Sequence, residues 1–79
     1  MHEYQIVLTK KAQKQLDKLP EKIAEPIIEA ISALEKNPRP KGCKKLKGRA
    51  GYRIRIGDYR VIYDIFDSEL IVDVITLGH

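Results

Sequence analysis

The chain has 79 residues, a single cysteine and a net charge of +4. This length allows one domain with a thin core, because folding at this size removes only about 60% of the extended chain's surface from water. The lone cysteine excludes an internal disulfide, and no apolar run reaches the roughly 18 residues of a membrane span, so we expect a soluble, cytoplasmic protein.

The start of the chain predicts a strand followed by a helix. Residues 4–8 are short and place apolar side chains on one face, which favours a strand. Thr9 is a residue type that caps helices, because its hydroxyl accepts a free backbone N–H. Residues 10–19 carry apolar side chains at helical spacing and lysines on the other face, which predicts an amphipathic helix.

Prolines bound a second predicted helix over residues 21–36. Pro20 separates it from the first helix, because proline disfavours helical backbone in the residue before it. Pro26 conflicts with a helix interior, since it removes a hydrogen bond and clashes with the preceding turn, so we expect a kink there or a later start. Asn37-Pro38 ends the helix. The two helices are expected to form a hairpin with one apolar face.

Positive charge is concentrated in residues 36–60, which hold ten Lys and Arg and one acid, Asp58. This stretch has a net charge of +9, whereas the rest of the chain is −5. Such a concentration is typical of a protein that binds a polyanion, because neutralised phosphates release condensed counterions. The alternative is a solvated segment that aids solubility. Residues 37–51 within it are rich in Pro, Gly and Lys and predict a loop.

The second half of the chain predicts three strands. Residues 52–56 alternate strictly, and Gly57-Asp58 suits a two-residue type II′ turn to a return strand over residues 59–66. A further turn leads to a last strand over residues 70–77. The order β-α-α-β-β-β predicts an α+β domain, with a two-helix hairpin packed on one face of a small, mainly antiparallel sheet.

The turn at Gly57-Asp58 fixes the register of the hairpin, so Arg55 lies opposite Arg60. Tyrosines and aliphatic residues share one face, which we expect to be buried, and Arg53 joins the two arginines on the other. Opposed like charges destabilise a sheet, but paired guanidinium groups bind phosphate oxygens well. The alternative is that the arginines extend into solvent or reach Asp64 and Asp73 on the same face.

Other side chains give weaker indications of chemistry. The tyrosines could stack on bases, but the register favours core packing for them. His79 ends the last strand and is a candidate general acid or base, although a lone terminal histidine is more often simply solvated. Two distant histidines and Cys43 do not make a metal site, and no cofactor motif is present. A nuclease built from these residues would use the RNA 2′-hydroxyl as nucleophile and arginines to stabilise the charge on the phosphate.

The segments KLKG (45–48), YRIRIGDYRVIY (52–63) and LGH (77–79) resemble the RelE branch of the RelE/ParE toxins. The resemblance extends over residues 1–79 as a single domain. It implies a toxin of a type II toxin–antitoxin system that cleaves mRNA on the ribosome and is neutralised by a cognate antitoxin protein. By position, it assigns RNA contact and catalysis to Arg53 and Arg55 and phosphate binding to Arg60. The candidate RNA-binding residues of the loop are Lys44, Lys45, Lys47 and Arg49.

The sequence departs from the RelE pattern after His79, where the family usually continues with an Arg and a Tyr that are implicated in catalysis. We therefore expect weak or no cleavage by residues 1–79, with binding partly retained. Two alternatives remain open from the sequence. One is a ParE-like inhibitor of DNA gyrase, and the other is a catalytically weak toxin that retains only antitoxin binding.

Overall fold

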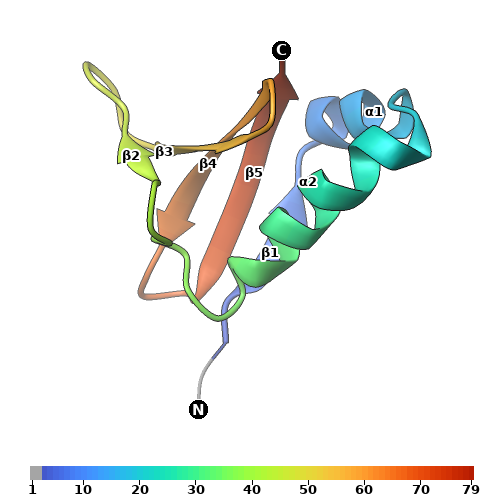
Figure 1. The fold of residues 1–79 in the computed structure, drawn as a ribbon. Coiled ribbons are helices and arrows are strands. Elements are labelled where there is room, and N and C mark those ends of the chain that lie inside the picture. The colour runs from blue at the N-terminus through green and yellow to red at the C-terminus, as the bar shows by residue number, and fades with distance from the viewer. Residues whose placement is uncertain (1–2) are drawn as a thin grey trace.

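The computed structural model describes residues 3–79, in which two helices cover one face of a five-stranded sheet (Figure 1). The elements are β1 (Gln5–Leu8), α1 (Lys10–Asp17), α2 (Glu21–Ala33), β2 (Lys44–Lys45), β3 (Tyr52–Ile56), β4 (Tyr59–Phe66) and β5 (Ile71–Gly78). The sheet order is β1-β5-β4-β3-β2, with β1 parallel to β5 and the other pairs antiparallel. The predicted α+β class is confirmed. The sequence missed β2, because two lysines among Pro and Gly carry no strand signal.

The helix boundaries follow from capping and from the prolines. The Thr9 hydroxyl accepts the Ala12 N–H at 3.1 Å, so the predicted cap of α1 is confirmed. Helix α2 begins at Glu21 and runs through Pro26, so the predicted later start is wrong. Pro26 is exposed, and water can therefore reach the carbonyl that lacks its helical partner. Helix α1 ends two residues and α2 three residues earlier than predicted. At both ends backbone N–H groups bond to the carbonyl three residues back instead of four, which is the tighter 3₁₀ pattern.

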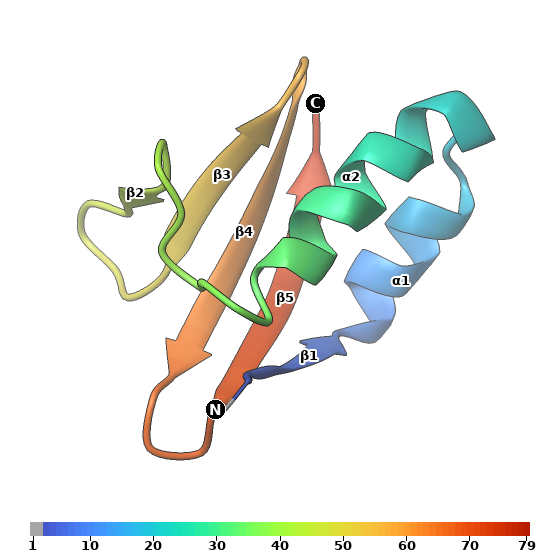
Figure 2. The same cartoon turned by 60° about the horizontal axis from the view of Figure 1, so that its bottom comes forward.

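The core lies between the helices and the sheet face that they cover (Figure 2). Its fully buried larger side chains are Tyr63, Ile27, Leu34, Val61, Val72 and Val74. The helices therefore leave the other face of the sheet available for function. No helix formed by residues 3–79 is long and apolar enough to cross a membrane.

Strand β5 contains an irregularity that strict alternation does not predict. Ile62 pairs with Thr76 and Tyr63 with Val74, so Ile75 is an extra residue in β5. Such a bulge shifts the phase of the strand. Val74 and Leu77 therefore both reach the core, whereas Thr76 and Gly78 lie on the opposite face.

The loop after α2 is fastened to the sheet by a polar cluster. The Arg39 guanidinium donates to both Asp67 carboxylate oxygens, at 3.2 and 2.9 Å, and to the Tyr52 hydroxyl. The Tyr4 hydroxyl donates to the same carboxylate at 2.6 Å. The hydrogen bonds from Arg39 and Tyr4 lower the pKa of Asp67 below its usual value. Arg39 is therefore held at the base of the basic loop and is not among the free cations of the outer face.

This cluster gives a pH-dependent contribution to folding stability. Because the folded pKa of Asp67 is depressed, its contribution is present at neutral pH and is lost as the pH falls through that folded pKa, below about 4. We expect Asp67→Asn to be less stable than the wild type at pH 7, with the difference shrinking toward pH 3. Chemical denaturation at several pH values measures it, and a difference that grows on acidification would contradict the assignment.

Candidate nucleic-acid interface

The β3–β4 hairpin forms the centre of the candidate site. Gly57 has a φ of 60° and Asp58 does not have a positive φ, which is the backbone pattern of the predicted type II′ turn. Ile56 pairs with Tyr59, Arg55 with Arg60 and Ile54 with Val61. The predicted register is therefore confirmed, and the two arginines are directly opposed.

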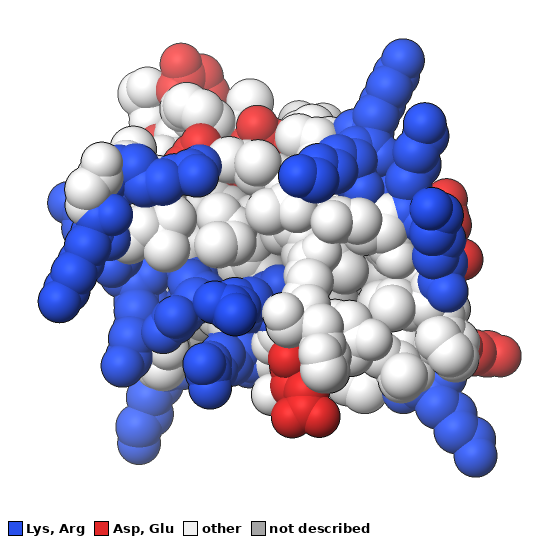
Figure 3. Space-filling view, turned by 90° about the horizontal axis from the view of Figure 1, so that it is seen from above, with Lys and Arg blue, Asp and Glu red and all other residues white. Residues whose placement is uncertain are grey.

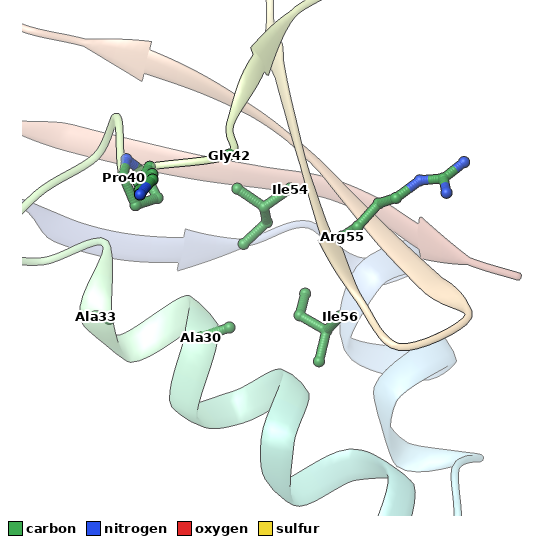
Figure 4. Close-up of a pocket in the computed structure, with 8 residues that line it drawn as sticks. Ala30, Ala33, Pro40, Gly42, Ile54, Arg55 and Ile56 are labelled. Carbon is green, nitrogen blue, oxygen red and sulfur yellow. The ribbon is translucent and has the colours of Figure 1, made fainter.

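The hairpin separates apolar and basic side chains onto its two faces. Figure 4 shows Ile54 and Ile56 pointing toward α2, whereas Arg55 projects away from the helix. Arg55 and Arg60 are exposed, and Arg53 is half-buried on the same face. The side chains of this outer face are thus free of the helices and available to an anion.

The structure also tests the alternative in which acids neutralise these arginines. Asp64 and Asp73 oppose each other on the outer face, farther along the strands. Within residues 3–79, the ion pair that forms is Arg39 with Asp67, and neither Arg55 nor Arg60 is hydrogen-bonded to an acid. The arginine pair therefore keeps its hydrogen-bond donors free for a ligand. Within residues 3–79, no acidic side chain forms an ion pair with Arg55 or Arg60, so the repulsion between the two arginines is not offset.

The basic loop contributes unequally to the arginine face. Lys44 pairs with Arg53 across β2 and β3, so it extends the outer face by one strand. Lys45 pairs with Tyr52 and therefore points to the opposite side. Lys47 and Arg49 are exposed in the loop that follows. Figure 3 shows Lys and Arg gathered on the sheet side of the molecule, at the left, and a second group on the helix side, at the right.

His79 lies near the arginine pair in the fold. It follows Gly78, which pairs with Arg60, and it lines a pocket of about 300 Å³ together with that arginine. Its ring packs edge-on against Tyr59, with centroids 5.2 Å apart. Tyr59 is half-buried, so the imidazole packs beside that tyrosine while His79 and Arg60 contribute to the same pocket.

Comparisons with known proteins indicate the family of this chain. The family model described as "ParE toxin of type II toxin-antitoxin system, parDE" matches residues 6–79. A relative named Toxin RelE, from Mycobacterium tuberculosis, is 37% identical over 79 residues, which cover 98% of this chain and 81% of the relative. The chain belongs to the RelE/ParE family of toxins. Both the resemblance and the fold class inferred from the sequence are thereby confirmed.

Solved structures of RelE/ParE toxins share the whole fold. A chain of the archaeal RelE–RelB complex from Pyrococcus horikoshii superposes with a TM-score of 0.85 at 31% identity, covering 95% of this chain and 92% of that one. A chain of the toxin–antitoxin complex RelBE2 from Mycobacterium tuberculosis gives a TM-score of 0.85 at 29% identity, with 98% coverage of both chains.

Sequence reasoning missed part of the surface next to the arginine pair of this RelE/ParE chain. Gln15 of α1 and Thr76 of β5 line the pocket that contains Arg60. The only sequence signal for Gln15 was its spacing. It comes three positions after Ala12, and Ala12 lies on the apolar face of the helix and is fully buried. Thr76 was hidden by the bulge, because strict alternation from Val74 would point it into the core.

Two further features concern ligands and partners of the RelE/ParE fold. Within residues 3–79, no group of three His, Cys, Asp or Glu side chains is placed to hold a metal ion. A groove of about 410 Å³ runs between α2, β3 and the loop around Gly42 (Figure 4). Ala30, Ala33, Lys41 and Ile54 are among the residues that line it.

Proposed function

We propose that this protein is a toxin of a type II toxin–antitoxin system that cleaves mRNA bound to the ribosome and thereby inhibits translation. The observation that carries the proposal is the directly opposed, exposed pair Arg55 and Arg60, with Arg53 and Lys44 one row away. Planar guanidinium groups bind phosphate oxygens two at a time, and nothing in a stable sheet otherwise favours opposed cations. The family relationship to Toxin RelE of Mycobacterium tuberculosis supports the same reading.

The proposed reaction needs no metal ion. The 2′-hydroxyl of the substrate attacks the adjacent phosphorus, the bond from phosphorus to the 5′-oxygen breaks, and the products are a 2′,3′-cyclic phosphate and a 5′-hydroxyl. Arg55 and Arg60 would hold the scissile phosphate and stabilise the negative charge that develops on its oxygens. Arg53 and Lys44 would bind the neighbouring phosphate. His79 is the candidate that carries a proton to or from the reacting oxygens.

The loop residues Lys45, Lys47 and Arg49 would add contacts to RNA or to the ribosome. They are exposed and do not belong to the cross-strand pair formed by Lys44 and Arg53. Contacts of this kind supply affinity through counterion release and carry no sequence information. We therefore assign them to binding and not to catalysis.

We further propose that a cognate antitoxin protein binds this toxin in the cytoplasm. The solved relatives include a RelE–RelB complex and the complex RelBE2. A stretch with a net charge of +9 on a thin-cored domain is readily covered by an acidic segment that folds on binding. The groove between α2 and β3 would receive apolar side chains of such a segment.

A second candidate function is inhibition of DNA gyrase, which the ParE name of the matching family model favours. The two functions make opposite predictions for cells in which the protein is induced. We expect mRNA to be cut within reading frames while chromosomal DNA stays intact, and primer extension beside a measurement of DNA breaks distinguishes them. Accumulated double-strand breaks with intact mRNA would refute the nuclease proposal and favour the gyrase inhibitor.

A further inference from the structure

A pocket on the outer face adjoins the arginine pair and is lined mostly by residues to which the proposed function gives no role. It encloses about 300 Å³ and is lined by Gln15, Arg60, Ile62, Thr76, Leu77, Gly78 and His79. Its walls come from α1, β4 and β5, and hydrogen bonds from β5 to Gln15 hold α1 against the end of that strand, as Figure 1 shows for the backbone. This volume is at the lower end of ligand sites, which span about 300–1,000 Å³.

The bulge at Ile75 creates the floor of this pocket. With strict alternation, Thr76 and Gly78 would face the helices and Leu77 would face outward. The extra residue reverses this, so Leu77 is buried and Gly78 lies opposite Arg60 on the outer face. A Cβ added at Gly78 would meet no atom within 4 Å, which leaves open space beside the guanidinium. Bulges are frequent next to active sites, where they redirect side chains in this way.

The amide of Gln15 has a fixed orientation at the pocket wall. Its Oε1 accepts the Leu77 backbone N–H at 2.9 Å and the Thr76 hydroxyl at 3.0 Å. A backbone N–H can only donate, so the oxygen must face the strand and the amide Nε2 must be directed away from it. Within residues 3–79, Gln15 Nε2 donates no hydrogen bond. Thr76, having donated its proton, presents lone pairs to the same pocket.

We propose that this pocket is a nucleobase subsite for the single-stranded RNA nucleotide adjoining the phosphate held by Arg55 and Arg60. The inference rests on the proposed ribonuclease function and extends it to base selection. Gln15 Nε2 donates to an acceptor on the edge of the base, and the Thr76 hydroxyl accepts from a neighbouring donor. Ile62 and the bare backbone of Gly78 provide a flat apolar surface for the ring.

The lining favours a base over a second phosphate. Arg60 is the one Lys or Arg side chain that lines the pocket, and the proposed function uses it to hold the scissile phosphate. The Gln15 amide and the Thr76 hydroxyl are neutral and fixed in direction by their hydrogen bonds, which suits the hydrogen-bonding edge of a base better than a diffuse charge. α1 thereby contributes a specificity-determining residue, whereas the hairpin supplies the charge.

Two substitutions test the subsite while keeping both arginines, and the phosphate titration of each variant checks that the arginine pair still binds an anion. Gly78→Val places a side chain in open space, and the glycine does not have a positive φ, so the strand tolerates it. Gln15→Met keeps the length of the side chain and removes the amide. Gln13→Met is the matched control, because Gln13 lies on the exposed side of the same helix and bonds only Asp17 within residues 3–79. Thermal unfolding checks that each variant is folded.

The probes are four 2′-O-methyl RNA trinucleotides of A, C, G and U, which cannot undergo attack by the 2′-oxygen, and inorganic phosphate. Binding is measured by NMR titration of the backbone and side-chain amides. In the wild type, we expect at least one trinucleotide to shift the Gln15 side-chain amide, whereas phosphate shifts only the arginine face. Gly78→Val and Gln15→Met should weaken the preferred trinucleotide about tenfold and reduce the differences among the four, while Gln13→Met changes neither.

The outcomes separate this inference from the function on which it rests. One outcome is that the trinucleotides shift the NMR resonances of Arg55 and Arg60 but not that of the Gln15 side-chain amide, and that both pocket variants bind them as the wild type does. The subsite is then refuted and the phosphate-binding role of the arginines stands. If neither phosphate nor any trinucleotide affects the arginine face, the proposed ribonuclease function fails together with the subsite.

Discussion

Replacement of Arg60 by alanine is expected to abolish growth arrest while leaving the protein folded. Arg60 is exposed and no hydrogen bond ties it to another side chain within residues 3–79, so its removal creates no cavity and no unpaired buried group. The proposed function, however, loses one of the two guanidinium groups that stabilise the charge on the scissile phosphate. Loss of a preorganised donor at such a site costs about 10²–10³ in rate.

The measurement compares growth after induction with ribosome-programmed mRNA cleavage by the purified chain. Lys22→Ala is the matched control, because Lys22 is also exposed and its loss changes the net charge equally. A second readout does not depend on cleavage: the salt dependence of single-stranded RNA binding should fall by the contribution of about one phosphate contact. Full toxicity of Arg60→Ala at wild-type expression would show that the phosphate clamp is wrong.

Replacement of Tyr63 by alanine is expected to unfold the protein. Tyr63 is fully buried in the centre of β4, and truncation of a buried aromatic residue costs about 3–5 kcal/mol. A domain of this length has a free energy of unfolding of about 4–12 kcal/mol, so little stability would remain. Chemical denaturation and the near-ultraviolet circular dichroism of the variant measure the loss.

Tyr63→Phe isolates the role of the hydroxyl in the same experiment. The hydroxyl donates to the Pro38 carbonyl at 2.7 Å, which joins the core to the start of the basic loop. The phenylalanine keeps the ring and leaves a carbonyl without its partner, so we expect a loss of about 1–3 kcal/mol. Burial raises the pKa of Tyr63, so the hydroxyl keeps its proton and this bond at alkaline pH.

Tyr59→Phe is the control for the hydroxyl, because Tyr59 is half-buried and its hydroxyl makes no hydrogen bond within residues 3–79. We expect a change within about 0.5 kcal/mol for that variant. Equal losses for Tyr63→Phe and Tyr59→Phe would contradict the proposed role of the Pro38 hydrogen bond in holding the loop.

Local rules were sufficient for the hairpin and hence for the centre of the candidate site. A two-residue turn with glycine first leaves only one pairing of its flanking strands, so Arg55 and Arg60 had to be opposed once Gly57 adopted a positive φ. The same alternation separated the apolar face from the basic one. Because these relations involve neighbours in sequence, they required no knowledge of the rest of the fold.

Contacts between distant segments decided what the sequence left open. In the sequence, Arg39 is one of ten cations that look equivalent. Only the tertiary structure shows that its guanidinium is hydrogen-bonded to Asp67 and Tyr52 and is therefore not free to bind a ligand. The lysines of the basic loop looked alike in sequence, and pairing with β3 placed Lys44 and Lys45 on opposite faces. Counting charges along the sequence does not reveal on which face each side chain lies or which acid it contacts.

The sequence by itself determined the order of all elements except β2, the hairpin register, the basic face and the family resemblance, because each follows from local periodicity, turn chemistry or a continuous motif. Only the tertiary structure decided the bulge at Ile75 and the packing of Gln15 on β5, which place an amide, a hydroxyl and a bare glycine beside Arg60. The physical reason is that a bulge and a long-range hydrogen bond depend on the strand across the sheet and on the helix beside it, which a reading along one chain cannot see.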